Sequence, residues 1–178
     1  VAGDIGPIGA LLRPLGTLSF DEAYDLFAEE VRAGVDAGVD LFIIETMTDL
    51  AEIKAAVLAC RENSDLPVFA TMTFEEDGRT FLGTSPEVAA ITLDAIGADV
   101  LGINCSQGPA ELRGLAARML TVTDKPVMVQ ANAGLPHVDD DGNTVFDIQA
   151  PEYAVAVAGM IEDGVSVVGG CCGTTPAH

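Results

Sequence analysis

The chain has 178 residues, a length that suits one domain. Its 28 acidic residues outnumber 8 basic ones, and the net charge of −20 argues against nucleic-acid partners and anionic membrane surfaces. Apolar residues make up 49% of the chain, which argues against disorder, and only 5% are aromatic, so the core must be mostly aliphatic. No apolar run reaches the roughly 18 residues that span a bilayer. The first residues lack the pattern of a signal peptide, so we expect a cytoplasmic protein.

Six short β-rich runs follow one another along the chain. Most are apolar on both faces, which is typical of parallel strands covered on both sides. The predicted strands are residues 1–6, 39–46, 67–74, 98–105, 126–133 and 165–172.

Helical patterns lie between these runs. The first has apolar residues at helical spacing, and Ser19 with Glu22 predicts a capping box at its start. Ser85 followed by Pro86 predicts another helix start. Alternating strands and helices indicate an α/β fold with a parallel sheet, and we expect one domain over residues 1–178. The predicted helices are residues 21–37, 50–61, 87–96, 110–120 and 152–162.

Polar side chains stand at the carboxyl end of almost every predicted strand. An open doubly wound sheet gathers function at one switch point, whereas a barrel brings all these strand ends to one mouth. The pattern therefore favours a (β/α)8 TIM barrel. Such a barrel has eight strands and only six are visible, so we expect an incomplete barrel. The polar strand-end residues are Asp4, Glu45, Thr46, Thr71, Thr73, Asn104, Cys105, Asn132, Cys171 and Cys172.

Three of the four cysteines lie at the carboxyl ends of two predicted strands, and the fourth, Cys60, has the helical context of a buried apolar residue. Glycines before and after Cys171 and Cys172 would let both sulfurs turn toward Cys105. Three thiolates at a barrel mouth would suit a zinc ion with one open position. Buried free thiols or a redox pair are equally consistent with the spacing. A zinc ion with three thiolate ligands would favour alkyl transfer to a bound thiol over hydrolysis, because it lowers the pKa of that thiol.

Two motifs carry a family resemblance. They are Gly102-Ile103-Asn104-Cys105 and Gly169-Gly170-Cys171-Cys172-Gly173-Thr174-Thr175-Pro176. The chain resembles the homocysteine S-methyltransferase family, and within it the homocysteine-binding module of cobalamin-dependent methionine synthases. The similarity covers essentially the whole chain, but the family's first two strands have no counterpart here, so residues 1–178 would supply about strands 3 to 8. The supporting stretches are residues 3–7, 44–46, 70–74, 78–84 and 130–136.

The resemblance implies a set of roles. By position, Cys105, Cys171 and Cys172 would bind zinc, and the sulfur of L-homocysteine would take the fourth position. Glu45 matches the family glutamate that binds the substrate amino group, and Asn132 matches an asparagine near the open zinc position. Weaker candidates for substrate binding, because they line the same mouth, are Asn104 and Asp4. Asn104 could instead orient the zinc loop.

The implied reaction is S-methylation of homocysteine to methionine. The resemblance implies methylcobalamin as the donor and methyltetrahydrofolate as the ultimate source, each on cobalamin- and folate-binding modules of the same or a partner chain. Two alternatives stay open: a standalone enzyme that uses betaine or S-methylmethionine, and a non-catalytic zinc-binding fragment.

Other motifs receive no catalytic role. The run around Gly142 fails as a calcium loop, because His137 and Ile148 would stand where oxygen ligands are required. A surface hairpin with an Asp-Gly turn is the better interpretation. Gly173-Thr174-Thr175 could bind phosphate, but the thiolates beside it argue against an anion. We place His137 and His178 at the surface.

Overall fold

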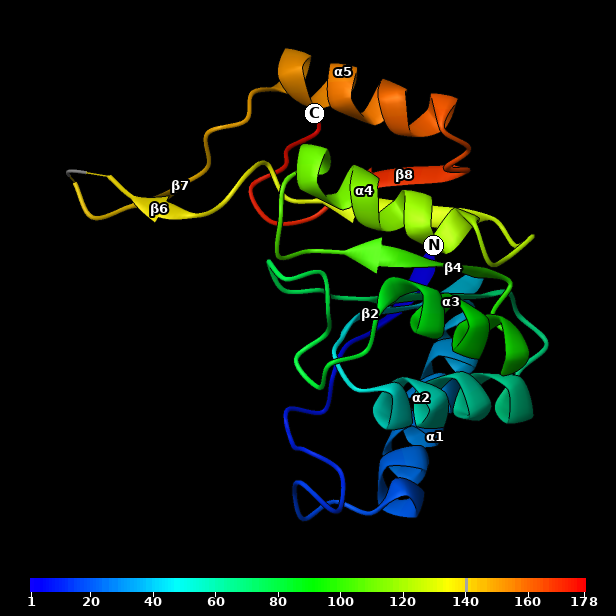
Figure 1. Cartoon of the computed structure of the whole chain (residues 1–178). Coiled ribbons are helices and arrows are strands. Elements are labelled where there is room, and N and C mark those ends of the chain that lie inside the picture. Colours follow the sequence, from blue (N-terminus) through cyan, green and yellow to red (C-terminus); the bar gives the residue numbers. More distant parts are fainter. Residues whose placement is uncertain (140) are drawn as a thin grey trace.

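The computed structural model describes residues 1–139 and 141–178 (Figure 1). Its main sheet has six strands in the order β1-β2-β3-β4-β5-β8, and every neighbouring pair is parallel. All six agree with the predicted strands. They are β1 (Ala2–Ile5), β2 (Leu41–Met47), β3 (Val68–Met72), β4 (Val100–Asn104), β5 (Val127–Ala131) and β8 (Val167–Gly170).

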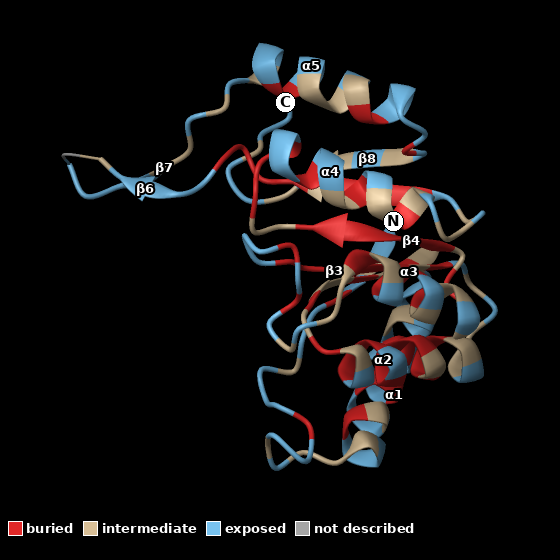
Figure 2. Ribbon diagram, in the orientation of Figure 1, coloured by how far each residue is buried: buried red, intermediate tan, exposed pale blue. Residues whose placement is uncertain are grey.

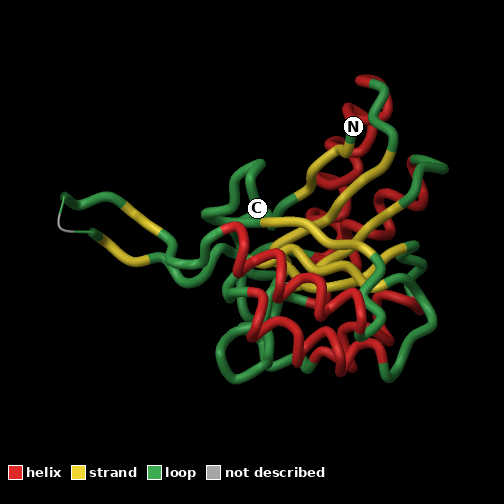
Figure 3. The backbone as a smooth tube through the Cα atoms, turned by 90° about the horizontal axis from the view of Figure 1, so that it is seen from above, coloured by secondary structure: helices red, strands yellow, loops and turns green. Residues whose placement is uncertain are grey.

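Five helices connect these strands and lie along one face of the sheet (Figure 1, Figure 3). The predicted capping box is confirmed: the Ser19 side chain accepts a hydrogen bond from the backbone N–H of Glu22, whose carboxylate accepts one from the N–H of Ser19. The helices are α1 (Phe20–Ala37), α2 (Leu50–Asn63), α3 (Pro86–Ala95), α4 (Pro109–Leu120) and α5 (Ala150–Glu162).

The core lies between this helical layer and the sheet (Figure 2). Phe42 and Ile44 of β2 are buried there, as are Leu101 and Ile103 of β4. Within the described part of the chain, β1 and β8 each pair on one side only, so they form the two edges of the sheet. Six parallel strands with connecting helices confirm the predicted α/β class, as an open part of a (β/α)8 barrel.

A short hairpin, β6 (His137–Val138) and β7 (Thr144–Val145), projects from the body of the molecule (Figure 1). The Asp139 carboxylate accepts hydrogen bonds from the backbone N–H groups of Asp141 and Asn143. The predicted surface hairpin is thus confirmed for the described residues, whereas Asp140 of the predicted turn lies outside them.

None of the helices within residues 1–139 and 141–178 has the length and apolar character needed to cross a membrane. The cytoplasmic location stays a prediction.

The glycine at the centre of β4 permits a close approach between two strands. A Cβ atom at Gly102 would lie 1.9 Å from the Met128 carbonyl oxygen of β5 and 2.7 Å from its carbonyl carbon. These are backbone atoms of a paired strand, so they cannot move aside without disturbing the sheet.

We therefore expect Gly102→Ala to lower the free energy of unfolding by about 3 kcal/mol or more, as measured by denaturant unfolding. Gly114→Ala is the matched control, because a Cβ atom at Gly114 in α4 would meet no atom within 4 Å. That change should be neutral or stabilise the protein by up to about 1 kcal/mol. Equal unfolding midpoints for the two variants would contradict the claim that β4 and β5 approach too closely at Gly102 to admit a side chain.

Candidate metal centre

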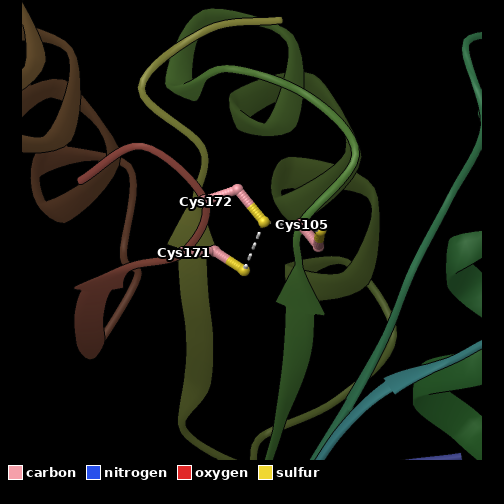
Figure 4. Close-up of side chains that lie close together, drawn as sticks. All are labelled: Cys105, Cys171 and Cys172. Carbon is pink, nitrogen blue, oxygen red and sulfur yellow. Dashed lines mark hydrogen bonds between the residues drawn. The ribbon is translucent and has the colours of Figure 1, made fainter. Parts of the chain in front are cut away.

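Three cysteine sulfurs meet at the carboxyl end of the sheet (Figure 4). Cys105 follows β4 directly, and Cys171 and Cys172 follow β8. The Sγ of Cys172 lies 3.8 Å from that of Cys105 and 3.9 Å from that of Cys171, and all three sulfurs lie within 4.8 Å of one another. The sequence prediction that these three residues come together is confirmed.

The backbone after each strand turns to direct these sulfurs inward. Cys105 and Ser106 both adopt left-handed φ angles, of 63° and 57°, which few residues other than glycine adopt. The backbone N–H of Cys171 donates to the carbonyl of Ala131, so the pairing of β8 with β5 continues into the loop. Gly173 then turns the chain with a φ of 77°. The adjacent cysteines can therefore face one point.

The spacing of the sulfurs fits a tetrahedral metal ion. Zinc–sulfur bonds of about 2.3 Å at tetrahedral angles separate two sulfurs by about 3.8 Å. Two of the three sulfur pairs are already at this separation within about 0.1 Å. The donor set also fits, because three thiolates without a histidine are soft ligands that suit zinc.

The three thiols do not share negative charge equally. The hydrogen bond with Cys171 is the main cause that lowers the pKa of Cys105 to about 5. The same hydrogen bond, followed by burial, raises the pKa of Cys171. Burial and then the interaction with Cys105 raise the pKa of Cys172. A second negative charge is therefore unfavourable in this cluster unless a cation balances it.

Cys60 has a different environment. It lies in α2 with no exposed surface, and burial raises the pKa of its thiol to about 12. It is not among the three clustered sulfurs, which agrees with the structural role predicted for it.

Asn132 supports the loop that carries Cys171 and Cys172 by a hydrogen bond to its backbone. It follows β5, is 3% exposed, and its Oδ1 accepts a hydrogen bond of 3.0 Å from the backbone N–H of Cys172. The side chain thus lies beside the sulfur cluster, as expected, and its oxygen holds the loop that carries two of the cysteines.

Glu45 lies near the end of β2 and is partly exposed. Burial is the main cause that raises the pKa of this carboxyl group, followed by the negative charges of Asp4 and Cys105. Asp4, on β1, is exposed. Because these like charges act on one another, a cationic group placed among them would be favoured.

Asn104 precedes Cys105 and is fully buried. Its side chain forms hydrogen bonds with Thr46 at the end of β2 and Thr71 of β3. The sequence predicts Asn104 at the mouth. In the structure, its carboxamide is there and forms hydrogen bonds with other residues of the protein.

Sequence reasoning missed two supports of the site. The Tyr153 hydroxyl of α5 lies 3.0 Å from the carbonyl of Ala131 and 2.7 Å from that of Gly169, at the ends of β5 and β8. His178 packs edge-on against Tyr153, and its Nε2 lies 3.0 Å from the carbonyl of Ile148. Neither residue lies in a recognisable sequence motif, so only the packing of the folded chain shows that both support the site.

Together these features define an α/β protein of the barrel type with a cluster of three cysteines, able to hold a metal ion, at the carboxyl ends of its strands. The family model described as homocysteine S-methyltransferase matches residues 1–178, and the chain belongs to this family. This confirms the family predicted from the two cysteine motifs.

Two curated relatives are methionine synthases. The chain is 39% identical to that of Mycobacterium tuberculosis and 38% identical to that of Mycobacterium leprae, in each case over 184 residues. Each alignment covers 100% of this chain but only 15% of the relative. The chain therefore corresponds to a small part of these relatives.

Solved structures support the fold. The homocysteine methyltransferase MmuM from Escherichia coli matches in its apo and metallated forms, each with a TM-score of 0.79 and 24% identity. The match covers 99% of this chain and 60% of the apo chain. A carboxyl transferase domain of Rhizobium etli pyruvate carboxylase matches with a TM-score of 0.63 and 16% identity, over 96% of this chain and 27% of that one. The predicted incomplete barrel is thereby confirmed.

Thiol reactivity should separate the two kinds of cysteine. In metal-free folded protein we expect a chromogenic disulfide reagent to react with the cysteine cluster, first at Cys105, which is partly accessible and whose pKa is lowered to about 5, and more slowly at Cys171 and Cys172, whose pKa values are raised. Cys60 should react only after unfolding, because it is buried and its pKa is raised to about 12. Counting released chromophore before and after denaturant measures this. Rapid reaction of Cys60 in the folded protein, identified by mass spectrometry, would contradict it.

Proposed function

We propose that this chain is a partial homocysteine-binding domain, spanning residues 1–178, of an enzyme that methylates L-homocysteine to methionine. The observation that carries the proposal is the cluster of three sulfurs within 4.8 Å of one another in a member of this family. The existence of a metallated form of the E. coli relative also supports metal binding by this chain.

Cys105, Cys171 and Cys172 would hold a zinc ion, and the fourth position would be open to the homocysteine sulfur. When bound, zinc supplies a positive charge that lowers the pKa of this thiol, so that the sulfur is kept as a thiolate. The chain's own residues hold the ligand loops in place. Asn132 does so by accepting the N–H of Cys172.

Glu45 would bind the amino group of homocysteine. Its carboxylate is partly buried beside other negative charges, which is a favourable environment for an ammonium group. Asp4 adds to the negative potential at the same mouth. Asn104 accepts a hydrogen bond from the backbone N–H of Thr46 and so supports the residue that directly follows Glu45. The zinc ion would thus bind the sulfur of homocysteine, and Glu45 would bind the amino group of the same molecule.

The reaction forms a carbon–sulfur bond. The homocysteine thiol loses its proton, the sulfur takes the methyl group, and the bond between methyl and donor breaks with its electron pair left on the donor. We propose methylcobalamin as the donor, with methyltetrahydrofolate as the ultimate methyl source. Both would be carried by other modules, because the methionine synthase relatives are much longer than this chain.

A standalone enzyme that uses betaine or S-methylmethionine is the alternative within the same family. The identity of 38–39% to methionine synthases, against 24% to MmuM, favours the modular enzyme. Supplying each donor to the purified full-length natural protein with L-homocysteine, and measuring methionine, distinguishes the two.

The metal assignment predicts a specific change at the zinc X-ray absorption edge. We expect a shell of three sulfurs and one lighter atom that becomes four sulfurs when L-homocysteine is added. Cys105→Ala, Cys171→Ala and Cys172→Ala should each lose stoichiometric zinc, whereas the control Cys60→Ala should retain it. Zinc retained at full stoichiometry after any of the first three changes would remove that residue from the ligand set.

The role of Glu45 predicts a selective loss of substrate affinity. Glu45→Gln should weaken L-homocysteine binding by about 10- to 100-fold, because a hydrogen bond between two charged groups is replaced by one in which only the ammonium group is charged. Zinc content should stay unchanged. Calorimetric titration of the zinc-loaded full-length protein measures the affinity, with Glu29→Gln, exposed on α1, as the control. An unchanged affinity for Glu45→Gln would assign this carboxylate a structural role.

A further inference from the structure

The end of β2 has an unusual backbone. Thr46 has a φ of 62°, in the left-handed region that a β-branched residue rarely adopts. The pairing of β2 with β3 also changes register between Ile44 and Met47. Such an irregularity redirects the side chains around it, and here it encloses Glu45 and Thr46. A conformation of this kind persists only where the surroundings impose it.

One buried side chain supplies that constraint. The Oδ1 of Asn104 accepts hydrogen bonds of 2.8 Å from the backbone N–H of Thr46 and from the Thr71 hydroxyl. Its Nδ2 donates a third bond of 2.8 Å to the Thr46 hydroxyl. Asn104 thus holds both the backbone and the side chain of Thr46. We call Asn104, Thr46 and Thr71 the Asn104 brace.

The brace joins the two halves of the proposed substrate site. Thr46 directly follows Glu45, and Asn104 directly precedes Cys105. The backbone of Asn104 is fixed as well, because its carbonyl accepts a 3.0 Å hydrogen bond from the Thr73 hydroxyl. The N–H of Cys105 donates 3.0 Å to the carbonyl of Gln130 on the next strand. These hydrogen bonds therefore restrict the movement of Glu45 relative to the sulfur cluster.

We propose that Asn104 is a positioning residue that sets the place of Glu45 relative to the three sulfurs, so that the amino group and the sulfur of one homocysteine are bound together. The inference rests on the proposed function of Glu45. Asn104 acts through Thr46 and not by touching the substrate, because its side chain is fully buried and both of its polar atoms are hydrogen-bonded within the protein.

The first test is Asn104→Ala in the zinc-loaded full-length natural protein. We expect the dissociation constant for L-homocysteine to rise by about tenfold or more, with zinc content unchanged. Thr46→Val removes only the hydroxyl contact and keeps the backbone bond to Oδ1, so it should act in the same direction with a smaller effect. It also serves if Asn104→Ala does not fold. Loss of zinc in both variants would overturn the proposal, because Asn104 would then support Cys105 instead of Glu45.

A double-mutant cycle with Glu45→Gln distinguishes positioning from general stabilisation. If Asn104 acts through Glu45, its replacement should change homocysteine affinity less than about twofold in the Glu45→Gln background. Leu93→Ala, buried in α3 and outside both the cysteine cluster and the Asn104 brace, is the stability control and should lower Tm without changing affinity.

Additive losses in the cycle would overturn the brace and leave the role of Glu45 intact. No loss of affinity for Glu45→Gln alone would overturn both. An affinity loss in Leu93→Ala that matches the loss in Asn104→Ala would also overturn the brace, because the affinity would then follow stability alone.

Discussion

All six strands of the main sheet run in one direction, and the rest of the site depends on this constraint. Parallel strands bring their carboxyl ends to one edge, so residues far apart in the sequence meet there. Cys105 follows β4 and the other two cysteines follow β8, yet their sulfurs lie within 4.8 Å of one another. One reversed strand would place a ligand at the opposite edge, where it could not take part.

Much of this arrangement could be predicted from the sequence. Strands buried on both faces appear as continuous apolar runs, and helices begin at recognisable caps such as Ser19, so both kinds of element depend mainly on local patterns. The meeting of the three cysteines follows from the strand ends alone. Spacing alone does not indicate zinc, because free thiols and a redox pair fit it equally well; the zinc proposal rests on the family motifs.

The conformation of Thr46 could not be predicted from the sequence. Local propensity argues against a left-handed threonine, and the bonds that hold it come from Asn104, which is 58 positions away. The contacts of Tyr153 could not be predicted either. Its hydroxyl contacts the ends of β5 and β8, but no sequence motif around it indicates this. These features depend on tertiary hydrogen bonds that override local preference, so only the folded chain reveals them.

The position of β8 has a mechanical consequence. Among the described residues it pairs only with β5, whereas Cys105 follows β4 on the far side of β5. A metal held by all three sulfurs would therefore cross-link two strands that do not touch, with β5 lying between them. The ion would thus tie the loops that follow β4 and β8 to each other across β5, so that metal binding and the packing of these loops become coupled.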